Sequence, residues 1–85
     1  MRLDKYLKIS RIIKRRTVAK EACDTGRVSI NGRTAKPGSE VKAGDVIEIR
    51  FGSRFLKAQI LGTPDVVRKG ESSGIYKIIE GEDNF

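Results

Sequence analysis

Hydrophobic residues near the start of the chain recur at the spacing of a helix. Three of them fall on one face of a helix that would run over residues 1–10: Leu3, Tyr6 and Leu7. Lys5 and Lys8 fall on the opposite face. Asp4 lies in the first turn, where the helix dipole favours a negative charge, and we expect it to pair with Lys8 one turn later. The pattern predicts a short amphipathic helix.

A second short helix is predicted between Thr17 and Thr25. Its apolar residues recur four positions apart, in the pairs Val18/Ala22 and Ala19/Cys23. Thr17 is a suitable N-cap, and Gly26 is a suitable stop because glycine readily adopts the left-handed conformation that ends many helices. Ile12 and Ile13 would be buried between the helices. We therefore expect two helices joined by a tight basic turn.

After Gly26 the pattern changes to the alternation that is typical of strands. Val28 and Ile30 alternate with polar residues and would share one face of a strand. The Asn31-Gly32 dipeptide predicts a hairpin with a type I′ turn, because both central positions of that turn need a positive φ. Further strands are predicted over residues 33–35, 46–51, 54–61 and 75–80.

These elements predict an α+β fold in which two short N-terminal helices pack on a small, mostly antiparallel sheet. The 85 residues are enough for one small core. We assign a main domain to residues 1–61 and a C-terminal extension, with one strand, to residues 62–85. Within the extension we expect a mobile loop at 68–74 and a loose acidic tail at 81–85.

Positive charge is concentrated in the first part of the chain. The formal net charge is +7 overall. Residues 1–57 hold fifteen Lys and Arg against six Asp and Glu, a balance of +9, whereas residues 58–85 hold three against five, a balance of −2. A field of one sign over part of a small protein is typical of a surface that faces a polyanion.

The densest positive charge lies around the start of the second predicted helix. Five cations occur within ten residues, with no acid among them: Arg11, Lys14, Arg15, Arg16 and Lys20. A cation at the positive end of a helix dipole costs about 0.3–1 kcal/mol, whereas a phosphate there is favoured by the dipole and by the free N–H groups. Arginine also suits bidentate phosphate contacts. The cluster predicts a phosphate-binding surface, which Arg2, Lys5 and Lys8 would extend.

The residues that enzymes and metal sites need are scarce. Cys23 is the single cysteine, so no internal disulfide can form, and its place on the apolar helix face indicates a buried thiol. The lack of histidine removes the usual general base and a common metal ligand. The chain contains the triplet Arg2-Leu3-Asp4, and an Arg-Leu-Asp triplet also carries the catalytic aspartate of pseudouridine synthases. This chain, however, is far too short for that catalytic domain. We expect a binding protein, not an enzyme, with no metal or cofactor.

No apolar run approaches the roughly 20 residues of a membrane span, and no signal-peptide pattern opens the chain. We therefore expect a soluble, cytoplasmic protein with no membrane contact. We also expect it to be a monomer.

DNA is an alternative ligand for a two-helix unit. The predicted second helix carries only three side chains suited to base edges: Lys20, Glu21 and Asp24. The basic residues lie before that helix and not along it, which favours recognition of RNA by shape and phosphate contacts. Competition between duplex DNA and structured RNA would distinguish the two ligands.

Aromatic and basic residues are interleaved between Arg50 and Phe55, as in proteins that bind single-stranded RNA. A turn is predicted at the centre of this segment, so we interpret Phe51 as a core residue. Arg50 and Arg54 would then be peripheral phosphate contacts.

Several segments together resemble the S-four RNA-binding domain. In chain order they are Arg2-Leu3-Asp4-Lys5-Tyr6-Leu7, the basic joint, the short helix to Gly26, and Arg27-Val28-Ser29-Ile30-Asn31-Gly32. Turns at Lys36-Pro37 and Gly44-Asp45 continue the similarity, which covers about residues 1–51. Within the family, the chain is similar to the heat-shock 15-kDa group, and most of all to its short ribosome-associated quality-control factors of the RqcP type.

The resemblance implies an RNA-binding face of the alpha-L type. Members of this group bind free large ribosomal subunits that carry peptidyl-tRNA on stalled, split ribosomes, and they contact both rRNA and tRNA. The RqcP-like members support template-free C-terminal alanine tailing by the tRNA-recruiting factor RqcH. An alternative is a ribosome-assembly or translation-regulatory RNA-binding protein without a tailing role. The RNA-binding positions that the resemblance implies, with Arg2 and Arg16 foremost, are Arg2, Asp4, Lys5, Arg11, Lys14, Arg15 and Arg16, to which the charge pattern adds Lys20.

Overall fold

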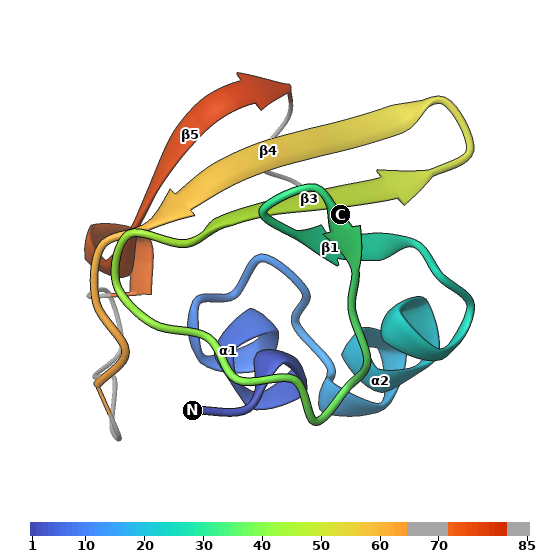
Figure 1. The fold of residues 1–85 in the computed structure, drawn as a ribbon, viewed down its shortest axis with the longest axis horizontal. Helices are drawn as coiled ribbons and strands as arrows, with labels where there is room; N and C mark the ends of the chain where they lie inside the picture. Colours follow the sequence, from blue (N-terminus) through green and yellow to red (C-terminus); the bar gives the residue numbers. More distant parts are fainter. Residues whose placement is uncertain (65–71, 82–85) are drawn as a thin grey trace.

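A computed structural model of the protein describes residues 1–64 and 72–81. Two helices come first, and strands make up most of the rest (Figure 1). In order, the elements are α1 (Leu3–Ile9), α2 (Arg16–Asp24), β1 (Val28–Ile30), β2 (Arg33–Thr34), β3 (Val46–Phe51), β4 (Arg54–Ile60), a short 3-10 helix (Ser72–Ile75) and β5 (Tyr76–Gly81). No helix among these residues is long and apolar enough to cross a membrane.

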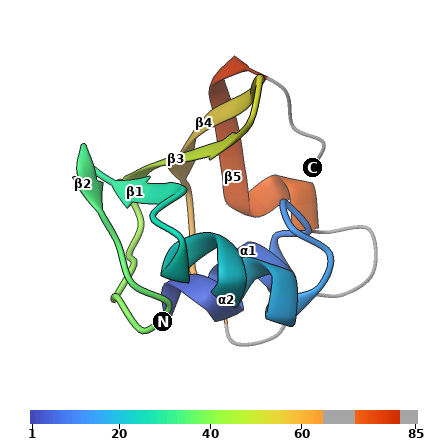
Figure 2. The same ribbon diagram turned by 90° about the vertical axis from the view of Figure 1, so that its right-hand side faces the viewer.

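The strands form one five-stranded sheet in the order β2-β1-β3-β4-β5, and every neighbouring pair is antiparallel. Helices α1 and α2 lie together against one face of this sheet, as Figures 1 and 2 show from two sides. The last strand, β5, returns to the edge of the sheet and pairs with β4. The predicted α+β fold, with two helices on an antiparallel sheet, is confirmed.

Helix α2 starts two residues earlier than an N-cap at Thr17 would place it. Its N-cap is Arg15, whose side chain forms no capping hydrogen bond, so the predicted capping role of Thr17 is wrong. Thr17 lies inside the first turn, where its hydroxyl is not placed to cap the helix. The predicted stop at Gly26 is confirmed: Gly26 has φ +75° and donates its N–H to the Cys23 carbonyl, and the Arg27 N–H reaches the Ala22 carbonyl. This is a Schellman ending.

The Asn31-Gly32 hairpin also forms as predicted, with φ values of 51° and 85° at its two central residues. The Asn31 side chain has a further role that the pattern does not indicate. Its Nδ2 donates to Asp45 Oδ1 at 3.1 Å, and its Oδ1 accepts the Val46 N–H at 2.9 Å. These bonds fix the hairpin to the start of β3.

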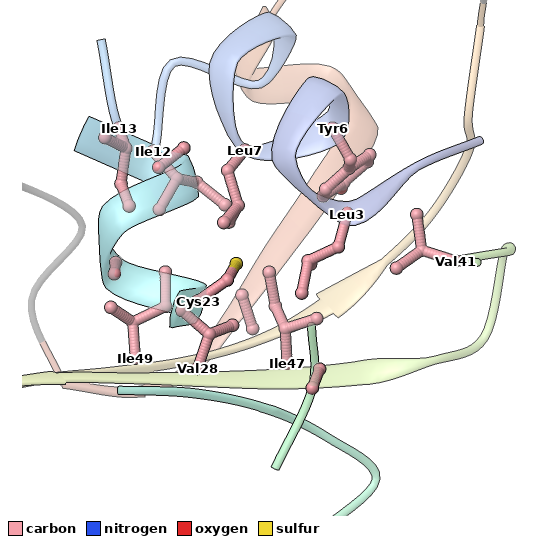
Figure 3. Packing of buried hydrophobic residues seen from close by; sticks show 14 of the residues in the cluster. Leu3, Tyr6, Leu7, Ile12, Ile13, Cys23, Val28, Val41, Ile47 and Ile49 are labelled. Atoms are coloured by element: carbon pink, nitrogen blue, oxygen red, sulfur yellow. The ribbon is translucent and has the colours of Figure 1, made fainter. Parts of the chain in front are cut away.

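The hydrophobic core lies between the two helices and the sheet (Figure 3). Helix α1, the joint between the helices, helix α2 and the strands all contribute to it; its larger members include Leu3, Tyr6, Leu7, Ile12, Cys23, Val28, Ile47 and Ile49. Val18 was expected to face this core with Ala22, but it is 38% exposed. The other three residues of the predicted pairs are buried, because α2 turns a narrow face of small side chains to the sheet.

The C-terminal part differs from the prediction in one place. Residues 72–75, which include the end of the predicted mobile loop at 68–74, form a 3-10 helix. A hydrogen bond from the Tyr6 hydroxyl to the Ile75 carbonyl, 2.9 Å long, fixes the end of this turn to α1. The rest of the predicted loop and residues 82–85 of the predicted tail lie outside the described residues.

Candidate nucleic-acid interface

The packing of α1 against α2 brings three charged side chains together. Arg2 Nε and Nη2 each lie 3.2 Å from an oxygen of the Asp4 carboxylate, and Arg16 Nη2 lies 3.6 Å from Asp4 Oδ1. The Asp4 side chain is 4% exposed, whereas those of Arg2 and Arg16 are 53% and 50% exposed. We call these three residues the Asp4 cluster. Its carboxylate is buried, and its two guanidinium groups reach the solvent side by side.

The expected pairing of Asp4 with Lys8 is wrong. A buried carboxylate needs close partners, and the start of α2 supplies one while Arg2 supplies the other. The Asp4 Oδ1 atom also accepts the Lys5 N–H at 2.8 Å, which holds the carboxylate at the start of α1. Lys8 is exposed on the outer side of the same helix.

The loop that follows β2 holds Arg2 in place. The Leu3 N–H donates to the Ser39 carbonyl at 2.8 Å, and the Asp4 N–H donates to the Pro37 carbonyl at 3.1 Å. Arg2 itself forms an isolated antiparallel bridge with Glu40. The backbone beside the Asp4 cluster is therefore fixed by a segment more than thirty residues away in the sequence.

The joint between the helices carries most of the remaining predicted cations. Arg11, Lys14 and Arg15 are exposed, and within the described residues their side chains form no ion pair. Arg11 has φ +60°, a left-handed conformation that costs a non-glycine residue about 1 kcal/mol or more. The first turn of α2 contains no acidic residue. Its N-terminal N–H groups and the neighbouring cations together favour an anion.

The two remaining predicted positions lie on the helices. Lys5 is partly buried on α1, and Lys20 is exposed on α2, one turn after Arg16. The structure thus brings Arg2, Asp4 and Arg16 into direct contact. It places the other predicted residues on the two helices and on the joint that connects them.

Two arginines, Arg50 on β3 and Arg27 just before β1, lie over aromatic rings. Arg50 Cζ is 4.7 Å from the centre of the Phe55 ring, and Arg27 Cζ is 5.4 Å from that of Phe51. Phe51 is partly buried and packs against the core, as predicted. The contact between Arg27 and the Phe51 ring was not predicted from the sequence, because it depends on how β1 lies beside β3.

Two ionisable side chains of the hydrophobic core, Cys23 and Tyr6, stay neutral. Burial raises the pKa of the Cys23 thiol from 9.0 to about 11, with smaller contributions from the negative charges of Asp4 and Asp24. Burial, and to a lesser extent Tyr76, raises the pKa of the Tyr6 phenol well above its ordinary value. Both groups are therefore protonated at neutral pH. The predicted buried, inert thiol is consistent with this.

The fold and the basic two-helix face define a small RNA-binding domain. The chain belongs to the S4 domain family, which its residues 1–47 match. It is also similar over nearly its whole length to proteins named RQC P-site tRNA stabilizing factor. The relative in Streptococcus pneumoniae is 53% identical over 79 residues, which are 93% of this chain and 90% of that protein. The relative in Bacillus subtilis is 50% identical over 82 residues, 96% of this chain and 95% of that protein.

A solved structure supports the same assignment. The trimeric heat shock protein 15 of Vibrio cholerae superposes with a TM-score of 0.83 at 33% identity, over 92% of this chain and 80% of that chain. The predicted resemblance to the S-four domain and to the heat-shock 15-kDa group is therefore confirmed.

Proposed function

We propose that the protein is an RNA-binding factor of ribosome-associated quality control. It binds rRNA of the large ribosomal subunit and peptidyl-tRNA on stalled, split ribosomes. It thereby supports the template-free C-terminal alanine tailing of nascent chains, with RqcH as its functional partner. It acts in the cytoplasm as a monomer, and it contributes binding without catalysis. Residues 1–61 form the RNA-binding domain, and residues 62–85 extend it.

The observation that carries this proposal is the Asp4 cluster. Two half-exposed arginines are held side by side on a buried carboxylate, at a helix start that has no acid of its own. Two guanidinium groups that a carboxylate holds in position are well placed to bind the phosphate oxygens of a folded RNA. The similarity to tRNA stabilizing factors over almost the whole chain supports tRNA as one of its ligands.

The predicted site residues fall into three groups by their role in the proposed complex. Arg2 and Arg16 contact phosphates directly, while Asp4 acts through them because it is buried beneath them. The cations of the joint and helices add contacts around this centre: Lys5, Arg11, Lys14, Arg15 and Lys20.

Sedimentation of the tagged protein from cell lysate tests the proposal. Wild type should comigrate with free large subunits and tRNA, whereas a variant with both Arg2→Ala and Arg16→Ala should stay at the top of the gradient. Lys77→Ala removes one positive charge from β5, away from the cluster, and should sediment like wild type. Wild type at the top of the gradient would refute the ribosomal role. Comigration with assembly intermediates alone would favour the ribosome-assembly alternative.

Replacing Arg11 with glycine should weaken RNA binding without lowering the stability of the fold. Glycine adopts the φ of +60° with little strain, so we expect the free energy of unfolding to stay the same or rise by about 0.5–1 kcal/mol. RNA affinity should nevertheless fall, because a cation of the joint is lost, and the salt dependence of binding should become less steep by about 0.7–0.9 per contact removed. Urea unfolding and RNA titrations at several salt concentrations measure both effects. Unchanged affinity and salt dependence would remove Arg11 from the interface.

A further inference from the structure

An apolar pocket lies beside the basic joint. It is lined by Ile13, Val18, Phe51 and Arg54 and has a volume of about 170 Å³. A second hollow, lined by Ile13, Lys14, Arg15 and Val18, adjoins it, since the two share Ile13 and Val18. The apolar floor of the pocket therefore continues directly to two exposed cations.

Val18 is an exposed apolar side chain at the edge of the pocket. It lies in the first turn of α2 and is 38% exposed, while the rest of the outer side of this helix is polar. A β-branched residue also has a lower helix propensity than alanine, lysine or glutamate. A single exposed valine is ordinary on a protein surface. This one is instead continuous with the buried Ile13 and the partly buried Phe51.

The walls of the pocket are attached to regular structure. Val18 is on α2, and Phe51 and Arg54 face each other across the paired strands β3 and β4. Ile13 is 3% exposed and is anchored by its N–H bond to the Leu7 carbonyl (Figure 3 labels its side chain beside α2). Arg27 lies over the Phe51 ring. A pocket built in this way exists before a ligand arrives, which lowers the cost of binding.

We propose that this pocket receives the base of one unpaired nucleotide of the bound RNA, with the adjoining phosphates on Lys14 and Arg15. The inference rests on the proposed RNA binding and adds base recognition to it. The pocket is smaller than the roughly 300–1,000 Å³ typical of sites for drug-sized ligands, and it suits a single flat ring system. Unpaired RNA bases are commonly recognised by packing on aromatic and guanidinium planes.

Charge complementarity selects a nucleotide over an apolar protein side chain. A nucleotide has an apolar face for Val18 and Phe51 and an anion for the two cations next to them. An apolar side chain of another protein would use the floor but would leave Lys14 and Arg15 without a counter-charge. The pocket thus makes part of RNA binding depend on a base, whereas the Asp4 cluster contacts phosphates whatever the sequence.

Two hairpin RNAs test the proposal: one with a single-nucleotide bulge, and the same RNA with an abasic bulge. We expect wild type to bind the abasic RNA about fivefold or more weakly. Methyl NMR signals of Ile13 and Val18 should shift on binding of the bulged RNA but not of the abasic one. Val18→Ala should keep the fold, because alanine is the better helix former at this exposed site, and should reduce the difference between the RNAs to less than about twofold.

Ile79→Ala is the matched control, since it truncates another exposed apolar side chain, 49% exposed on β5. It should discriminate between the RNAs as wild type does. Equal affinity of wild type for both RNAs, with unshifted methyl signals, would overturn the proposal. If Arg16 were still needed for binding both RNAs, the proposed RNA-binding role would stand. Loss of large-subunit comigration in Val18→Ala, together with equal affinity of wild type for both RNAs, would assign the pocket to a protein side chain instead.

Discussion

Replacing Arg16 with alanine is expected to lower RNA affinity by about tenfold to a hundredfold. The side chain is half exposed, starts α2 and is directed by Asp4, so it is placed to donate charge-assisted hydrogen bonds to phosphate. A hydrogen bond to a charged group is worth about 1.5–3 kcal/mol, and each 1.4 kcal/mol is a factor of ten in affinity. The slope of log affinity against log salt should fall by about 0.7–0.9. Fluorescence titrations at several salt concentrations measure both quantities.

The fold should tolerate this change. Removing a cation from the positive end of α2 relieves about 0.3–1 kcal/mol of repulsion, and losing a half-exposed ion pair costs about 0–1 kcal/mol, so the two effects nearly cancel. Arg16→Lys keeps the charge but not the planar fork of donors, and it should have intermediate affinity. A large loss of stability in Arg16→Ala would mean that the residue is structural. Normal affinity in a folded variant would place the RNA elsewhere.

Replacing Asp4 with alanine should weaken RNA binding by about tenfold, although it removes a negative charge from the interface. Simple electrostatics predicts the opposite result, because the local field becomes more positive. The carboxylate, however, holds both Arg2 and Arg16 at fixed positions, and without it each guanidinium must be ordered when RNA binds. Stability should fall by about 1–2 kcal/mol, since the bond to the Lys5 N–H is also lost. RNA titration and urea unfolding measure the two effects.

Asp24 provides the matched control for Asp4. It is an exposed carboxylate at the end of α2, and Asp24→Ala should leave RNA affinity unchanged or slightly raised. Asp4→Asn keeps the size and one acceptor oxygen, and it should lie between wild type and Asp4→Ala. If folded Asp4→Ala bound RNA as tightly as wild type or more tightly, Asp4 would have no positioning role.

The local elements follow from short-range sequence signals. The periods of the apolar residues place both helices and the main strands, and Gly26 and Asn31-Gly32 mark a helix end and a hairpin through their positive φ values. These signals are reliable because the preferences involved act within a few residues. The basic joint at the start of α2 is equally local, since it consists of adjacent side chains.

The contacts of Asp4 and the exposure of Val18 depend on packing. From the sequence, Lys8 is the nearest suitable partner for Asp4, whereas the folded chain supplies Arg2 and Arg16. One hint was available: Asp4 is the only acid among the cations before Glu21.

The sequence by itself therefore determined the two α-helices, the main strands, the fold class and the place of the basic cluster. Only the tertiary structure decided which cations share a buried counter-ion, and which apolar residues form a pocket beside them. The physical reason is the range of the interactions involved. Helix periods and turns are set by residues that are neighbours in the chain. The Asp4 cluster and the pocket between α2 and the β3–β4 turn depend instead on how separate elements are rotated against one another.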